Sequence, residues 1–281
     1  MLELTEIAIS AAIEGAREIM KVYAKEDFNV QLKSDQSPLT EADLKSNAVI
    51  EAALSKTHIP ILSEEGAEIL YEDRKNWKQL WIVDPLDGTK EFVKRNGEFT
   101  VNIALAENSY PVMGVIFAPY LNCLYWGDES GACKSQFTED WMDITTDKVI
   151  AEMDIIRLPN PLPELKTLVA SKSHFTPETG DYIELLKEKE GEIELVSKGS
   201  SLKMCLVAEG QAHLYPRLGP TMEWDTAAGQ AIIEATGGQL FDWHTKERMC
   251  YNRPELRNGW FLCVASAINP QAYWLLNEYN Q

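Results

Sequence analysis

The chain has 281 residues, of which 45% are hydrophobic and 25% are charged. This composition is ordinary for a folded globular protein, and the length suffices for one large domain or for two lobes. The formal net charge of -18, from 26 Lys and Arg residues against 44 Asp and Glu residues, argues against a nucleic-acid polymer as a partner. The same charge would repel a phosphorylated substrate, so a phosphate site here requires bound cations or local basic side chains.

Five cysteines are scattered along the chain without CxxC spacing. An odd, dispersed set indicates reduced thiols in a cytoplasm, not a disulfide framework or a zinc site. The N-terminal stretch carries acids where a signal peptide carries bases, and no apolar run has the length of a membrane span. We therefore expect a soluble, cytoplasmic monomer or homodimer, with peripheral contact at the inner face of the membrane left open.

Two helices are predicted near the N-terminus. Residues 4–23 place apolar side chains on one face at helical spacing, which predicts a structural amphipathic helix. Residues 40–43, Thr-Glu-Ala-Asp, fit a capping box ahead of a helix that runs to about Leu54. Asp43 then lies in the first turn, where capping of its own helix is a sufficient reason for an acid.

Two short apolar runs that follow both end in acids. Residues 59–63 lead into Glu64 and Glu65, of which we expect only one to face a site, because neighbours on an extended chain point opposite ways. Residues 81–83 lead into the segment 84–89, Asp-Pro-Leu-Asp-Gly-Thr. Strand ends at one edge of a sheet can bring such acids together.

The segment 84–89 has a geometry with chemical meaning. Pro85 is expected to end the strand because it has no N–H for the ladder, Gly88 permits a turn, and Thr89 opens a helix. Carboxylates bind divalent cations, while the N–H groups of a helix start bind a phosphate oxygen. Asp-Pro and Asp-Gly are also common turn dipeptides, so a solvated acidic turn is the alternative.

The middle of the chain predicts a scaffold sheet. Residues 99–105, 112–118 and 121–126 are rich in β-formers and form an antiparallel meander. Residues 134–165 show no clear pattern, and the proline cluster at 159–163 is typical of a linker. We therefore expect an N-terminal lobe over residues 1–158 and a C-terminal lobe over residues 159–281.

The second half alternates strand and helix signals, which indicates α/β layers. The expected strands cover residues 168–171, 193–196, 214–216, 239–242 and 260–265, and the expected helices residues 177–189, 201–208, 224–235 and 273–279.

Two helix starts in this half could carry chemistry. Asp225 opens a helix whose next residues are small, although a plain cap would explain it. Gly199, Ser200 and Lys203 combine a turn, a hydroxyl and an ammonium that together could bind an anion. The alternative is a capped helix with a solvated lysine.

Three motifs resemble the inositol monophosphatase superfamily of magnesium-dependent, lithium-sensitive phosphatases: residues 62–65, 84–89 and 224–229. Within it, residues 84–105 and 199–229 look most like the CysQ-type 3'(2'),5'-bisphosphate nucleotidases. The resemblance implies an α/β (α+β) fold, a layered αβαβα sandwich with two lobes.

The resemblance also implies the site. Two or three Mg2+ ions are expected to be held by four carboxylates and one backbone carbonyl: Glu64, Asp84, Leu86 (carbonyl), Asp87 and Asp225. Asp43 and Thr89 match the pair that assists attack by an activated water molecule, without a phosphoenzyme. Substrate contacts are expected from Glu64, Asp87, Gly88, Thr89, His174, Ser200, Lys203, Arg217 and Asp225.

The expected activity is removal of the 3'-phosphate of adenosine 3',5'-bisphosphate, with the sulfated analogue as a second substrate. A surface loop position would equally explain His174. An inositol or sugar phosphate phosphatase of the same superfamily is the alternative enzyme. A phosphate-binding regulatory protein without catalysis is a more distant one, because such proteins usually lack a ligand that this sequence retains.

Overall fold

The computed structural model describes residues 2–26, 31–32, 38–171 and 175–276. Its helices are α1 Leu2–Tyr23, α2 Glu41–Leu54, α3 Tyr71–Arg74, α4 Thr89–Val93, α5 Thr146–Ala151, α6 Pro177–Glu190, α7 Leu202–Ala208 and α8 Glu223–Ala235. Its larger strands are β3 Ile61–Ser63, β4 Gln79–Asp87, β5 Thr100–Glu107, β6 Tyr110–Ala118, β7 Cys123–Asp128, β8 Gly131–Gln136, β9 Ile156–Leu158, β10 Lys166–Val169, β11 Ile193–Val196, β12 Leu214–Arg217, β14 Gln239–Asp242 and β16 Phe261–Val264. Two small ladders join β1 Gln31–Leu32 to β2 Pro38–Leu39, and β13 Thr221–Met222 to β15 Arg257–Asn258.

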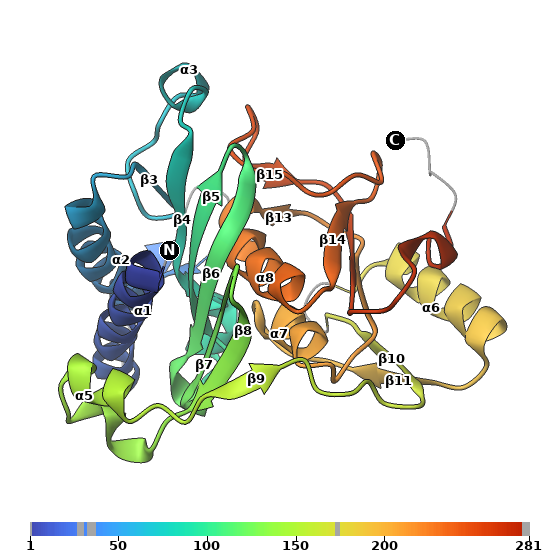
Figure 1. Ribbon diagram of the computed structural model, residues 1–281, viewed down its shortest axis with the longest axis horizontal. Helices are drawn as coiled ribbons and strands as arrows, with labels where there is room; N and C mark the ends of the chain where they lie inside the picture. The colour runs from blue at the N-terminus through green and yellow to red at the C-terminus, as the bar shows by residue number, and fades with distance from the viewer. Residues whose placement is uncertain (1, 27–30, 33–37, 172–174, 277–281) are drawn as a thin grey trace.

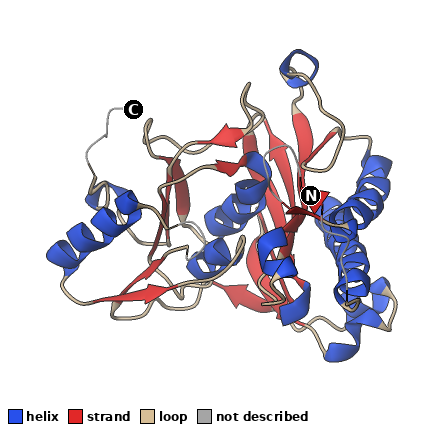
Figure 2. Ribbon diagram, turned by 180° about the vertical axis from the view of Figure 1, so that it is seen from behind, coloured by secondary structure: helices blue, strands red, loops and turns tan. Residues whose placement is uncertain are grey.

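The molecule is a stack of five layers (Figures 1 and 2). Helices α1 and α2 cover one face of the seven-stranded sheet β3-β4-β5-β6-β7-β8-β9, and α7 and α8 cover the other. These two helices also pack on the five-stranded sheet β11-β10-β12-β16-β14, whose far face is covered by α6. The expected αβαβα sandwich is confirmed.

Alternation along β4 shows how one strand serves two cores. Trp81 and Val83 pack with α1 and α2, whereas Leu80 and Ile82 pack with α7 and α8. A strand that is buried on both faces is apolar throughout, which is why its sequence gives an uninterrupted hydrophobic run.

The expectation that Pro85 ends this strand is wrong. β4 extends to Asp87, and its pairing with β5 is irregular between Asp84 and Asp87. A bulge of this kind accommodates a proline that cannot donate to the ladder and re-aims the side chains around it. The bulge therefore gives the acidic segment its shape.

The helix expected at residues 273–279 is wrong for its described part. A short 3-10 helix covers Pro270–Ala272, and residues 273–276 are not helical. The Tyr273 carbonyl accepts a hydrogen bond from the Tyr182 hydroxyl at 3.0 Å, and Tyr273 and Leu276 are buried against α6 and the second sheet. Tertiary contacts override the local helical pattern here.

The change of sheet falls between β9, which ends at Leu158, and β10, which begins at Lys166. The division into two lobes at residue 158 stays a prediction. Among the described residues, none of the helices combines the length and the apolar character that crossing a bilayer demands.

Candidate active site

Three of the expected acids meet at one point between the two halves of the chain. Asp84, Asp87 and Asp225 each place a carboxylate oxygen within 4.8 Å of the others. The first two come from the end of β4 and the third from the first turn of α8, so the packing of α8 on the seven-stranded sheet assembles the cluster. Glu64, at the end of β3, lines the same pocket as Asp87 and Asp225, whereas Glu65 is not among the lining residues.

Local hydrogen bonds hold these carboxylates in place. The Leu86 N–H donates to Asp84 Oδ1 at 3.0 Å, and the Met222 N–H donates to Asp225 Oδ2 at 2.8 Å. The Ser46 hydroxyl on α2 donates to the Pro85 carbonyl at 2.8 Å. Asp225 thus caps its helix and also belongs to the cluster.

The three carboxylates of the cluster repel one another unless a positive charge lies between them. Burial raises the pKa of Asp84 well above its usual range, and the neighbouring Glu64, Asp87 and Asp225 carboxylates raise it further. Burial raises the pKa of Asp87 to about 6, and burial together with Asp87 raises the pKa of Asp225 to about 8. Each shift reflects the cost of crowding like charges away from water.

The donors fit a hard divalent cation. All are oxygen atoms, and no soft ligand is part of the group. Mg2+ and Ca2+ prefer such ligands, whereas thiolate or imidazole would favour zinc or copper. The Leu86 carbonyl oxygen lies 3.3 Å from the Thr89 hydroxyl oxygen, so this carbonyl is close to the start of α4.

Asp43 and Thr89 are brought together as expected. The Thr89 hydroxyl donates to Asp43 Oδ1 at 3.2 Å, and Asp43 Oδ2 accepts from the N–H and the hydroxyl of Thr40 at 2.8 and 2.7 Å. The capping box expected at the start of α2 is confirmed. It fixes one oxygen of Asp43 in the cap and leaves the other for Thr89, so capping and contact with the site do not compete.

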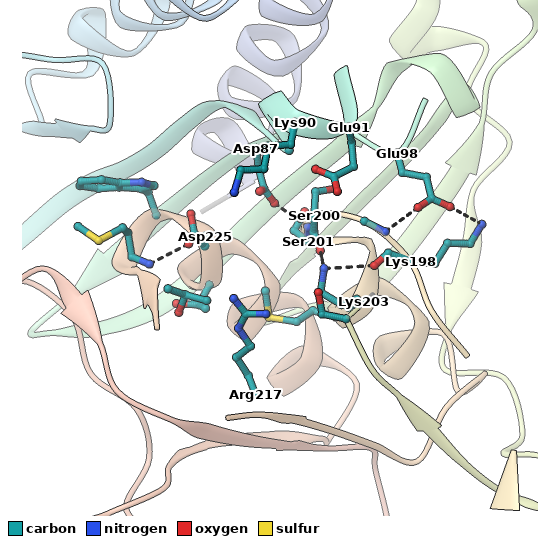
Figure 3. Close-up of a pocket in the computed structure, with 18 of the residues that line it drawn as sticks. Asp87, Lys90, Glu91, Glu98, Lys198, Ser200, Ser201, Lys203, Arg217 and Asp225 are labelled. Carbon is teal, nitrogen blue, oxygen red and sulfur yellow. Dashed lines mark hydrogen bonds and ion pairs between the residues drawn. The ribbon is translucent and has the colours of Figure 1, made fainter. Parts of the chain in front are cut away.

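The basic residues lie in the same pocket, which has a volume of about 730 Å³ (Figure 3). Lys203, only 8% exposed, donates to the carbonyls of Ser200 at 2.5 Å and Lys198 at 3.3 Å. The alternative of a solvated lysine is therefore wrong. Burial lowers the pKa of Lys203 to about 8, and the negative charge of Asp87 opposes that shift.

Arg217 points from β12 into the pocket and is also 8% exposed (Figure 3). Its Nη2 donates to the Pro220 carbonyl at 3.1 Å, but its buried Nε has no hydrogen-bond partner among the described residues. A buried donor without an acceptor is costly, so this N–H is available to an acceptor group bound in the pocket. His174 lies outside the described residues.

Sequence reasoning missed two polar residues that connect the site. The Asn102 amide donates to Asp87 Oδ2 at 3.4 Å, and its carbonyl oxygen accepts the Ser201 hydroxyl at 2.8 Å. The Ser201 N–H donates to the same Asp87 oxygen at 2.6 Å. An asparagine within the apolar run of β5 was the available signal, because a buried polar side chain requires partners.

Comparisons with known proteins agree with this architecture. The model of the inositol monophosphatase family matches residues 1–275. The chain is 44% identical over 231 residues to a Shigella flexneri protein named 3'(2'),5'-bisphosphate nucleotidase CysQ, covering 81% of this chain and 86% of that one. It is 45% identical over 231 residues to the Salmonella typhimurium protein of the same name, with the same two coverages. The crystal structure of CysQ from Bacteroides thetaiotaomicron matches with a TM-score of 0.83 at 46% identity, covering 95% of this chain and 98% of that one.

The family match spans nearly the whole chain, and the αβαβα stack and the acid cluster at the end of β4 and the start of α8 are consistent with it. The chain belongs to the inositol monophosphatase family.

Proposed function

We propose that this protein is a Mg2+-dependent phosphatase that removes the 3'-phosphate of adenosine 3',5'-bisphosphate to leave AMP and phosphate, with the sulfated analogue as a second substrate. The observation that carries the proposal is one pocket that is lined both by acids of the cluster and by the basic side chains of Lys203 and Arg217. The acid cluster would bind phosphate through cations, and Lys203 and Arg217 would bind it directly. The names of the relatives from Shigella flexneri and Salmonella typhimurium support the same reading.

An anion site formed by Lys203 and Arg217 would favour a bisphosphate over a monophosphate. A substrate with one phosphate needs only the cations at the acid cluster. A second dianion requires charge of its own, and an arginine beside a lysine is a strong pairing for phosphate. The buried Nε of Arg217 is a donor that such a phosphate would satisfy.

Each site residue then has a role. Two or three Mg2+ ions would be held by Glu64, Asp84, the Leu86 carbonyl, Asp87 and Asp225. When bound, Mg2+ supplies positive charge to the transferred phosphate and lowers the pKa of water.

The pair formed by Asp43 and Thr89 handles the proton. The Thr89 hydroxyl donates its proton to Asp43, so the lone pairs of the Thr89 oxygen are free to accept a hydrogen bond from the attacking water. As the water attacks, its proton passes to Thr89 and the Thr89 proton passes to Asp43. The N–H groups of Gly88 and Thr89 contact the scissile phosphate. Ser200, Lys203, Arg217 and His174 hold the nucleotide.

Steady-state kinetics on two substrates test the proposal. With Mg2+ present, the wild type should turn over adenosine 3',5'-bisphosphate faster than inositol 1-phosphate, and a chelator should abolish both activities. Lys203→Ala should lower kcat/KM for the bisphosphate at least about tenfold, the typical cost of losing a hydrogen bond to a charged group. It should change kcat/KM for inositol 1-phosphate by less than about twofold. An equal loss on both substrates would instead favour an inositol or sugar phosphate phosphatase.

A further inference from the structure

The turn that carries Ser200 lies against a loop from the other half of the chain. We propose that Glu98, in that loop, is a positioning residue that holds the turn Lys198–Ser200 and thereby sets the affinity for the second phosphate of the substrate. This inference rests on the proposed function, because it names a further residue on which recognition of the bisphosphate depends.

The Glu98 carboxylate contacts two residues of the turn Lys198–Ser200 (Figure 3). Its Oε2 accepts the Gly199 N–H at 2.8 Å, and its Oε1 is 3.3 Å from the Lys198 ammonium. The first contact fixes the backbone of the turn directly. The second is an ion pair between partly exposed side chains, 40% exposed for Lys198 and 28% for Glu98, so it contributes little to stability.

The loop and the turn fit closely at this point. The Asn96 side chain accepts the Glu98 N–H at 2.9 Å, which orients the backbone that carries the carboxylate. A Cβ atom at Gly199 would lie 2.8 Å from the Glu98 carbonyl oxygen and 2.9 Å from Glu91 Cγ. Only glycine allows this approach, so the turn is built to lie against the loop.

Through the turn Lys198–Ser200, Glu98 also influences the position of the Lys203 ammonium. Ser200 has a φ of 42°, a left-handed conformation that a serine adopts only when its surroundings impose it. The carbonyl of this residue accepts the Lys203 ammonium at 2.5 Å. On its other side the turn is held by the Ser201 N–H, which donates to Asp87 at 2.6 Å. Two acids of the first half therefore hold the turn, one at each end.

Charge opposes a direct contact between Glu98 and the second phosphate. A carboxylate near the second phosphate repels it, so Glu98 opposes affinity through its charge and supports it through the hydrogen bond to Gly199. Glutamine keeps an oxygen acceptor for that N–H and removes the repulsion. The positioning role thus predicts that Glu98→Gln behaves like the wild type, whereas Glu98→Ala does not.

Kinetics on a matched pair of substrates test the inference. Adenosine 3',5'-bisphosphate carries the second phosphate, and adenosine 3'-phosphate lacks it. Glu98→Ala should raise KM for the bisphosphate about tenfold, because a charge-assisted hydrogen bond that orders the turn is lost. It should leave kcat within about twofold, and KM for the monophosphate within about twofold. Glu98→Gln should restore KM for the bisphosphate to within about threefold of the wild type.

Glu184→Ala is the matched control, because Glu184 is an exposed acid paired with Lys187 on α6. Its kinetics should equal those of the wild type. If urea unfolding shows that Glu98→Ala is unstable, Glu98→Asp provides a second test. The shorter aspartate side chain moves the acceptor oxygen away from Gly199, so this variant should raise KM for the bisphosphate alone.

The outcomes separate the two proposals. A wild type that leaves the bisphosphate intact refutes the proposed function, and the inference falls with it. A wild type that hydrolyses the bisphosphate, with equal KM changes on both substrates or with an unchanged KM in Glu98→Ala and Glu98→Asp, overturns the role of Glu98 alone.

Discussion

Replacing Arg217 by methionine should separate substrate recognition from stability. The guanidinium is 8% exposed and its Nε lacks a partner among the described residues, which costs about 1–3 kcal/mol in the free protein. Methionine fills similar space in β12 and removes the unpartnered donor, but it also removes the positive charge that lowers the pKa of Asp225 and the hydrogen bond to Pro220. These effects oppose each other, so Arg217→Met should unfold at about the same urea concentration as the wild type. The lost contacts with phosphate should lower kcat/KM for the bisphosphate by about 1.5–3 kcal/mol, or roughly 10- to 150-fold.

The assay combines urea unfolding without substrate with kinetics on adenosine 3',5'-bisphosphate and adenosine 3'-phosphate. Arg248→Met is the matched control, because Arg248 pairs with Glu234 and stacks on Tyr110 with no place in the pocket. It should show the reverse pattern, a small loss of stability with unchanged kinetics. The reasoning is refuted if Arg217→Met loses stability like the control, or if both substrates suffer equally.

Three further predictions follow from the site and the core. Asp43→Asn should lower kcat about 10²- to 10⁴-fold while the unfolding midpoint changes little, because the amide cannot accept the proton passed by Thr89; phosphate release at the wild-type rate would contradict this role. Mg2+ should raise the urea midpoint of the wild type, because it binds only the native state, and Asp225→Asn should lose most of that rise; an equal rise in both proteins would place the ion elsewhere. His213 is buried, and its Nδ1 accepts the Thr167 N–H at 3.1 Å. Burial lowers the pKa of His213 in the folded protein. As the pH falls, the unfolded state therefore binds a proton at a higher pH than the folded state does. The free energy of unfolding consequently decreases as the pH falls below about 6.5. Urea midpoints from neutral to acidic pH should fall more steeply for the wild type than for His213→Gln, and parallel curves would exclude His213 as the source.

The elements predicted correctly are those whose signal is local. The helical spacing of apolar residues in 4–23 correctly predicted one helix, α1. The capping box of Thr40 and Asp43 was also predicted correctly, and its two residues lie within one helical turn. The strand at residues 193–196 was predicted with its observed bounds. Periodicity and capping depend on neighbours within a few residues, so the sequence displays them directly.

The elements that were missed or wrong depend on distant partners. Strand β9 consists of Ile156–Leu158 and exists because it pairs with β8, which the expected meander did not include. Pro85 ends no strand because a bulge accommodates it. Tyr273 joins no helix because its ring and carbonyl are held by α6.

The sequence by itself predicted the residues of the candidate site: oxygen ligands, the pair of Asp43 and Thr89, and the basic residues Lys203 and Arg217. The resemblance of the motifs already implied that Asp225 joins Asp84, and the folded structure places their carboxylate oxygens within 4.8 Å of each other. Only the tertiary structure decided that Glu98 accepts a hydrogen bond from the Gly199 N–H, about a hundred residues away. The physical reason is that α7 and α8 pack between two sheets, and this packing fixes which helix start meets which strand end. No local pattern of residues encodes that choice.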